Sequence, residues 1–320
     1  MGNAGVLAVV MLLSAAVPGQ AGEPVWNVAR VGGPVPVAGA VVAVVDSGVD
    51  AGHPTFGGRV LAAIDLVGGS GGDPNGHGTH VAGTAGGGDA GPGVGVAPAV
   101  SILPVRVLGP DGSGQLSTVA EGIRRATDAG ADVINLSLGD DVVILNPTRQ
   151  ALADAIHYAW SRGAICVLAA GNEGLLGVLG SGYGDLPAVV VTATGFDDRL
   201  APYATRLGNV RWGLSAPGGD GRGDDHDILS AWPGGTYARM AGTSMAAPHV
   251  SGALAVLRSL GLDPTAAVHR LLGTARPIGP AGTYGSGLLD LGAAVSDLAV
   301  PTSTAPPQPV PPGVGQEPAT

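Results

Sequence analysis

Three short segments of the chain carry the residue types needed to hydrolyse an acyl bond through a nucleophile. Asp46 ends the apolar run VVAVVD, His77 lies between two glycines in NGHGTHVAG, and Ser244 follows a glycine and a threonine in AGTSMAAPH. A serine hydroxyl is a weak nucleophile at neutral pH unless an imidazole accepts its proton and a carboxylate orients that imidazole. The three side chains could form such a relay if the fold brings them together.

Each of these residues also has a structural interpretation. A carboxylate at a strand end often forms a turn, a lone histidine is commonly structural, and a serine at a helix start is commonly an N-cap. His80, three residues after His77, raises the alternative of a metal-binding pair, but no HExxH motif or suitably spaced carboxylate accompanies it. At a helix N-terminus, Ser244 would also lie near free N–H groups and the positive end of the helix dipole, which favour both a nucleophile and an oxyanion. His249 is expected to pack or hydrogen-bond within the helix and not to act as the base.

The elements that must position these residues follow from the hydrophobic pattern. Strands are expected at residues 40–46, 60–65, 101–108, 133–137, 164–170 and 188–194, and helices at 117–129, 148–162 and 265–272. Several strand runs are apolar at successive positions, which is typical of strands covered on both faces of a parallel sheet. The alternation predicts a single α/β domain with a doubly wound, mainly parallel sheet and helices on both faces. Ligands of such sheets bind at the carboxyl ends of the strands, where Asp46 lies.

The three motifs, in the chain order Asp, His, Ser, resemble those of the subtilisin-like serine protease family (subtilases, peptidase family S8). The similarity extends over about residues 26–295 and includes SILPVRVLGPDGSGQLS, INLSLG, AAGNEG and SAPGG. The resemblance implies a serine endopeptidase that forms an acyl-enzyme on Ser244, with His77 as general base and acid and Asp46 orienting His77. It also implies that the side-chain amide of Asn172 and the Ser244 N–H form the oxyanion hole. On its own, Asn172 could equally be a turn residue.

The resemblance further implies where a protein or peptide substrate binds. An extended peptide would add as a strand to two edges and place one side chain against a wall of small residues. The first edge is Gly112, Ser113 and Gly114, the second is Ser137, Leu138 and Gly139, and the wall is Ala169, Ala170 and Gly171. Small, uncharged walls indicate medium or large apolar side chains in the substrate.

The alternative from another functional class is a catalytically silent subtilase-like domain that binds peptides or proteins. Loss of Asp46, His77, Asn172 or Ser244 would mark such a domain, and all four residues are present.

Both ends are expected to lie outside the folded domain. Residues 6–17 form an apolar run too short to span a bilayer comfortably, and small residues at 19 and 21 suit cleavage after Ala21, so residues 1–21 are predicted to be a secretory signal peptide. The Pro-rich residues 300–320 are predicted to be a disordered tail without a membrane anchor. Residues 22–299 would then form the catalytic domain of a secreted protein. This domain would begin so soon after the cleavage site that no room is left for a propeptide, which secreted subtilases usually carry.

Composition narrows the range of partners and cofactors. The net charge is −10 and no basic cluster is present, which argues against nucleic acid or an anionic membrane as a partner. Cys166 is the only cysteine, so no intrachain disulfide can form, and it is expected to be a small buried hydrophobe. The chemistry requires no cofactor and no metal ligand is assigned, although the acidic loop at residues 218–227 could supply oxygen ligands to a structural calcium ion. A monomer is expected.

Overall fold

The centre of the molecule is a seven-stranded sheet in which every strand pairing is parallel, with the order β10-β9-β8-β7-β3-β5-β4. The computed structural model describes residues 6–8, 12–13, 25–69, 71–88, 90–138, 147–173 and 181–300. The strands of this sheet are β3 (Val41–Asp46), β4 (Ile64–Asp65), β5 (Ser101–Arg106), β7 (Val133–Leu136), β8 (Ile165–Ala169), β9 (Ala188–Thr194) and β10 (Trp212–Pro217). The predicted parallel sheet is therefore confirmed.

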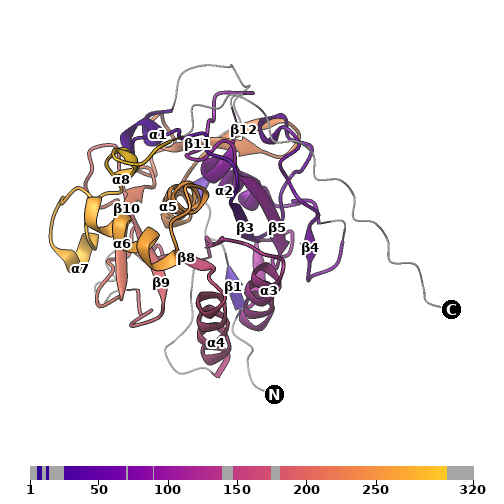
Figure 1. The fold of residues 1–320 in the computed structure, drawn as a ribbon. Helices are drawn as coiled ribbons and strands as arrows, with labels where there is room; N and C mark the ends of the chain where they lie inside the picture. The colour runs from indigo at the N-terminus through magenta and orange to yellow at the C-terminus, as the bar shows by residue number, and fades with distance from the viewer. Residues whose placement is uncertain are drawn as a thin grey trace.

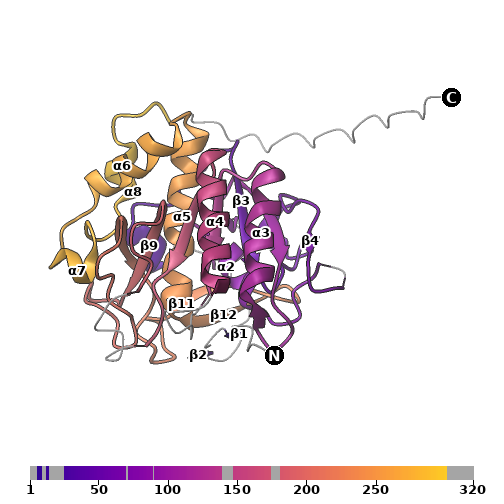
Figure 2. The same cartoon turned by 90° about the horizontal axis from the view of Figure 1, so that it is seen from below.

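Helices cover both faces of the sheet, as the sequence predicts. Figure 1 shows α3 (Leu116–Asp128) and α4 (Pro147–Ser161) on one side of the strands, and α2 (His77–Gly86) and α5 (Thr243–Ser259) on the other. Figure 2 shows the same layers from below. The two faces of β3 belong to separate hydrophobic clusters, with Val42 and Val44 packed into one and Ala43 and Val45 into the other. Because both faces are buried, the strand has no polar alternation, and its apolar run is explained.

The burial of side chains in α3 and β8 follows the pattern of the local sequence. In α3, Val119, Ile123 and Ala126 are buried, whereas Glu121 and Arg125 are exposed and form an ion pair one helical turn apart. In β8, Cys166 is fully buried between neighbouring strands, and burial raises the pKa of its thiol to about 12. Its expected role as a buried hydrophobe is confirmed.

Smaller elements surround this sheet. They are α1 (Trp26–Arg30), the 3₁₀ helix η1 (Pro54–Phe56), β6 (Ser113–Gln115), β11 (Ile228–Trp232), β12 (Thr236–Ala241), α6 (Pro264–Thr274), α7 (Ala281–Tyr284) and α8 (Leu291–Val295). Two short strands of the N-terminal segment, β1 (Val6–Ala8) and β2 (Leu12–Leu13), pair antiparallel with β6 and β12 respectively. Most of the predicted signal peptide, and residues 301–320 of the predicted tail, lie outside the described residues. Among the described helices, none combines the length and the apolar character needed to cross a bilayer.

The strand order reverses beside β3. The chain passes from β3 to β4 and β5 on one side, and then crosses to β7, β8, β9 and β10 on the other. In open α/β sheets such a switch point leaves a crevice at the carboxyl ends of the strands, where ligands bind. Asp46 is the last residue of β3, and Ser137 directly follows the neighbouring β7.

Candidate active site

Asp46 is held rigidly at the end of β3. Its side chain is fully buried, and the backbone N–H of Ser47 donates a hydrogen bond to its Oδ1 over 2.7 Å. Both carboxylate oxygens face His77, whose Nδ1 lies 2.8 Å from Oδ1 and 3.0 Å from Oδ2. Because a carboxylate accepts hydrogen bonds, Nδ1 carries the ring proton in this arrangement.

His77 reaches Asp46 because two glycines let α2 begin very close to the sheet. Gly76 has a φ of 100°, and a Cβ atom there would lie 2.4 Å from the ring of Trp232. A Cβ atom on Gly78 would lie 2.1 Å from the carbonyl oxygen of Gly48. Any other residue would therefore push the helix start away from the end of β3.

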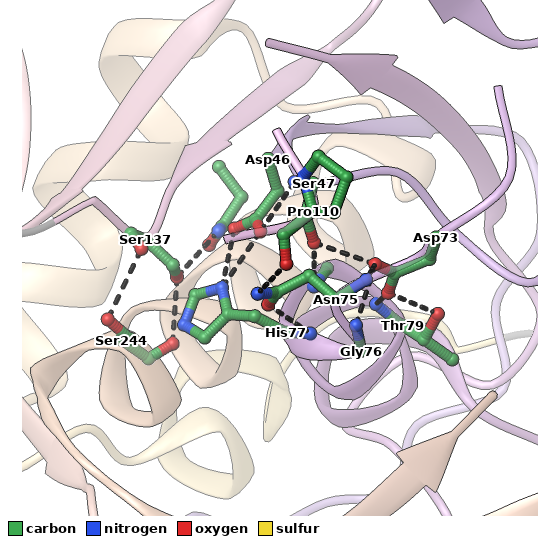
Figure 3. Close-up of polar contacts among 12 residues, drawn as sticks. Asp46, Ser47, Asp73, Asn75, Gly76, His77, Thr79, Pro110, Ser137 and Ser244 are labelled. Carbon is green, nitrogen blue, oxygen red and sulfur yellow. Dashed lines mark hydrogen bonds and ion pairs between the residues drawn. The ribbon is translucent and has the colours of Figure 1, made fainter. Parts of the chain in front are cut away.

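The other ring nitrogen of His77 is available for proton transfer. Nε2 is buried and has no hydrogen-bond partner among the described residues. Figure 3 shows the imidazole between Asp46 and Ser244, with Nε2 on the Ser244 side. With Nδ1 protonated, the neutral ring has its lone pair on Nε2, where a general base needs it.

Ser244 lies in the first turn of α5, and the end of β7 fixes its position. Its Oγ donates to the carbonyl oxygen of Ser137 over 3.2 Å, and its own carbonyl oxygen accepts from Ser137 Oγ over 2.7 Å. Asn135 Nδ2 in turn donates to Ser137 Oγ. The hydroxyl is thus bonded to Ser137 here and not to His77. Rotation about the Cα–Cβ bond would redirect it, and catalytic hydrogen bonds often form only with substrate bound.

Asn172 lies beside the start of α5, three residues beyond β8. Its Oδ1 accepts from the N–H of Thr243 over 3.0 Å and from Thr243 Oγ1 over 3.1 Å. Since Oδ1 is engaged in this way, the amide nitrogen is the end left for a ligand, and it lies near Gly242. The structure therefore brings Asn172 next to Ser244, two residues implied together by the sequence resemblance.

The predicted substrate edges lie around this centre. Ser113 and Gly114 belong to β6, whose antiparallel partner is β1 of the same chain, and the wall residues Ala169, Ala170 and Gly171 run from the end of β8 toward Asn172. Ser137 and Leu138 directly follow β7, and Gly139 lies outside the described residues. A small apolar hollow lies beside the start of α3, lined by Leu116, Val119, Leu136, Leu138, Leu152, Leu168 and Tyr183.

The two other histidines of these motifs serve the packing of the helices. His80 Nε2 donates to the carbonyl oxygens of Ile228 and Ala238, so this nitrogen offers no lone pair to a metal ion. Desolvation by burial, and then the nearby His77, lower the pKa of His80 to about 3. His249 Nδ1 donates to Met245 O within α5, as expected, and desolvation lowers its pKa to about 4.

The acidic loop at residues 218–227 uses its carboxylates mainly to shape itself. Asp227 is buried and accepts from the N–H groups of Gly221 and Gly223. Asp220 accepts hydrogen bonds from Phe196 N and from His226 Nδ1. These contacts stabilise the conformation of the loop. A calcium site in the loop stays a prediction.

Sequence reasoning missed one polar residue of the site. Asp73 lies four residues before His77 and accepts several hydrogen bonds from the segments that carry Asp46 and His77. An acidic residue just before a helix start is a known capping signal, and that signal could have identified it.

A buried Asp–His pair at the switch point of a parallel α/β sheet, facing a serine at a helix N-terminus, defines the class of subtilisin-like serine endopeptidases. The sequence model of the subtilase family, peptidase S8, matches residues 38–287, and the chain belongs to this family. It is 39% identical to thermitase of Thermoactinomyces vulgaris over 250 residues, which is 77% of this chain and 84% of thermitase. It is 36% identical to subtilisin DY of Bacillus licheniformis, and the alignment covers 79% of this chain and 89% of subtilisin DY. It is also 36% identical to subtilisin BL of Lederbergia lenta, and the alignment covers 84% of this chain and 97% of subtilisin BL.

Proposed function

We propose that this serine endopeptidase cleaves peptide bonds through an acyl-enzyme on Ser244, with His77 as general base and acid and Asp46 orienting His77. The observation that carries the proposal is the buried imidazole whose Nδ1 is bonded to Asp46 and whose Nε2, on the side of Ser244, has no hydrogen-bond partner in the described part of the chain. A base held in one tautomer, with its lone pair toward a hydroxyl, is the arrangement that activates serine.

Each step then follows from these atoms. Ser244 Oγ attacks the carbonyl carbon of the peptide bond while its proton passes to His77 Nε2. The tetrahedral intermediate collapses as Nε2–H protonates the leaving amine, which leaves an ester on Ser244. A water molecule attacks this ester and gives its proton to Nε2. Protonation of Ser244 Oγ then releases the acid product and restores the enzyme.

The oxyanion of each tetrahedral intermediate is proposed to accept hydrogen bonds from Asn172 Nδ2 and from the N–H of Ser244. Thr243 fixes the carbonyl end of the Asn172 amide, which supports this orientation. The N–H of Ser244 lies in the first turn of α5, where backbone N–H groups have no intrahelical acceptor and the helix dipole favours negative charge.

The substrate is proposed to bind as an extended strand along β6 and residues 137–139, with apolar side chains in the neighbouring hollow and against residues 169–171. The pairing of β1 with β6 supports this proposal, because it places an antiparallel strand on that edge. The lining of the hollow is aliphatic apart from Tyr183. We further propose that the enzyme is secreted after cleavage behind Ala21, acts as a monomer and needs no cofactor for the chemistry.

Labelling with a fluorophosphonate probe tests the proposed nucleophile. Wild type should be labelled covalently, and Ser244→Ala should lose both labelling and casein hydrolysis, because the acylated oxygen is gone. Ser161→Ala, at an exposed position of α4, is the matched control and should be labelled as wild type is. Labelling that persists in Ser244→Ala would reject the assignment. Folded wild type that is not labelled would favour the catalytically silent, peptide-binding alternative.

The proposed base is tested in parallel. His77→Ala should reduce casein hydrolysis by orders of magnitude without unfolding the protein, because nucleophile and base act as a unit. His157→Ala, an exposed histidine of α4, provides the control. Wild-type turnover in His77→Ala would contradict the role given to His77.

A further inference from the structure

The carboxyl group of Asp73 lies where the segments that carry the proposed base and its orienting carboxylate meet. The side chain is 9% exposed. Its Oδ1 accepts hydrogen bonds from Ser47 Oγ (2.8 Å), Asn75 N (3.1 Å) and Gly76 N (2.8 Å), and its Oδ2 accepts from Thr79 N (2.8 Å) and Thr79 Oγ1 (2.6 Å). Figure 3 shows this cluster on the side of His77 remote from Ser244.

One of these contacts reaches the strand that carries Asp46. Ser47 directly follows Asp46, and its hydroxyl donates to Asp73 while accepting from the N–H of Gly78 over 3.0 Å. The same hydroxyl therefore touches Asp73 and the backbone next to His77. Ser47 is fully buried, so water does not compete for these contacts.

The remaining contacts hold the start of α2. These contacts are made to the N–H groups of Gly76, the N-cap of α2, and of Thr79 in the first turn of the helix. The cluster is thus a closed ring. It runs from Asp46 through Ser47 and Asp73 to the first turn of α2, and returns through the His77 imidazole to the Asp46 carboxylate.

We infer that Asp73 is a positioning residue, which fixes the distance between Asp46 and His77 by tying Ser47 to the first turn of α2. Among the described residues, Asp73 has no hydrogen bond to Ser244 or to the proposed substrate edges, so it acts through the two residues that it positions. The inference rests on the proposed function for its kinetic consequence, but the geometry of the ring can be measured without any activity.

The chemistry of the cluster requires a carboxylate. All five groups that face Asp73 are donors, and a carboxylate accepts at both oxygens. An amide at this position would turn its NH₂ group toward at least one of these donors and leave it unpaired. A residue that only capped α2 would need the contacts to the helix but not the contact to Ser47. The contact between Asp73 and Ser47 therefore distinguishes a positioning role of Asp73 from a role in helix capping alone.

The experiment compares Ser47→Ala and Asp73→Asn, alone and together, with Asp263→Asn as the matched control. Asp263 caps α6, where its Oδ1 accepts from Ala266 N over 2.9 Å, and α6 contributes nothing to the site. We expect kcat to fall about 10- to 100-fold in Ser47→Ala and in Asp73→Asn, because small displacements of a catalytic group have effects of this size. KM should stay within about twofold, because neither residue touches the substrate. The double variant should lose less than the product of the two single losses, since both changes break one ring.

A second readout is independent of turnover. The proton on His77 Nδ1, which is buried against Asp46, should give a downfield resonance in the ¹H NMR spectrum of wild type. In Ser47→Ala this resonance should shift or broaden, and in Asp263→Asn it should not change. Kinetic constants are to be expressed per folded molecule, with the folded fraction measured by circular dichroism.

The inference is overturned if folded Ser47→Ala keeps kcat within twofold of wild type together with an unchanged Nδ1 resonance. It is also overturned if Asp263→Asn lowers kcat as much as Asp73→Asn does, because the effect would then be one of general stability. If wild type neither hydrolyses peptides nor reacts with a fluorophosphonate, the proposed function fails instead. The Nδ1 resonance in Ser47→Ala still decides the positioning role in that case.

Discussion

The two nitrogens of the His77 imidazole have different environments. Nδ1 is bonded to Asp46, whereas Nε2 is buried without a partner among the described residues. A buried polar atom that lacks a hydrogen bond is unfavourable by about 1–3 kcal/mol, so such atoms are rare in folded proteins. The unpaired Nε2 atom beside Ser244 is consistent with a base that forms its hydrogen bond only during a reaction.

The proposed place of the Asn172 amide in the oxyanion hole predicts a loss of transition-state stabilisation and not of substrate binding. Asn172→Leu should lower kcat by about 100- to 1,000-fold with little change in KM, because the hydrogen bond removed is the one proposed to form mainly to the oxyanion. This magnitude is the one known for the loss of such a donor in subtilisin. Steady-state kinetics on a peptide substrate measure it, with the exposed Asn209→Leu as control. An unchanged kcat would remove Asn172 from the proposed oxyanion hole.

The helices α2 and α5 each bury a neutral histidine in the layer that carries the site. His80 on α2 bonds to β11 and β12, and His249 on α5 accepts from Asn27 of α1 over 2.8 Å. These contacts connect the two helices to the small elements around them. The two buried histidines lower the stability of the folded state at low pH, because each histidine must stay uncharged in that state.

The pH dependence of folding should show this cost. Burial lowers the pKa of His249 from 6.5 to about 4, so the unfolded chain binds more protons than the folded chain between these values. The free energy of unfolding should therefore fall as the pH drops from about 6.5 to about 4. At about 1.4 kcal/mol per pKa unit, His249 alone accounts for about 3 kcal/mol.

His249→Gln tests this expectation in a Ser244→Ala background, which prevents self-digestion. The variant should be less stable at pH 7 but should lose less stability between pH 6.5 and pH 4, as measured by urea unfolding. His157→Gln, at an exposed position, should keep the wild-type pH dependence. An equally steep loss in His249→Gln would contradict the expected contribution of His249.

The hydrophobic pattern predicted most strands of the central sheet, but it missed β10, whose six residues are all buried, and the peripheral strands. The apolar runs at residues 40–46 and 188–194 correspond to β3 and β9, and the amphipathic segment at 117–129 corresponds to α3. The run predicted at 60–65 is shorter in the structure, with β4 confined to its last two residues. β6 was missed as a strand because its sequence SGQ has no apolar pattern and its pairing partner is more than 100 residues away.

The same distinction applies to the site. Asp46, His77, Asn172 and Ser244 stand in recognisable motifs, and the structure brings them together. The roles of Asp73 and Ser137 depend on hydrogen bonds to backbone groups of distant segments, and the sequence contains no sign of which backbone groups those are.

The N-terminal segment occupies the strand edge to which the substrate is proposed to bind. β1 pairs with β6 and β2 pairs with β12, and both N-terminal strands fall within the predicted signal peptide at residues 1–21. Cleavage after Ala21 would remove both strands and leave the β6 edge free for another peptide.

A chain that begins at Gly22 should therefore bind substrate more tightly than a chain that keeps residues 1–21. We expect a lower KM for a peptide substrate and the same kcat per active site, because an attached strand competes only with substrate binding. A chain that ends at Val300 but keeps residues 1–21 controls for truncation itself. Equal KM values for the chains with and without residues 1–21 would contradict the competition.

The central sheet also contains the only sulfhydryl group of the chain. Cys166 is fully buried in β8 between β7 and β9, and its pKa of about 12 keeps it in the unreactive protonated form. An alkylating reagent can reach this sulfur only after these strands separate. In the Ser244→Ala protein, the rate of alkylation therefore measures how often the sheet opens, and no added probe is required.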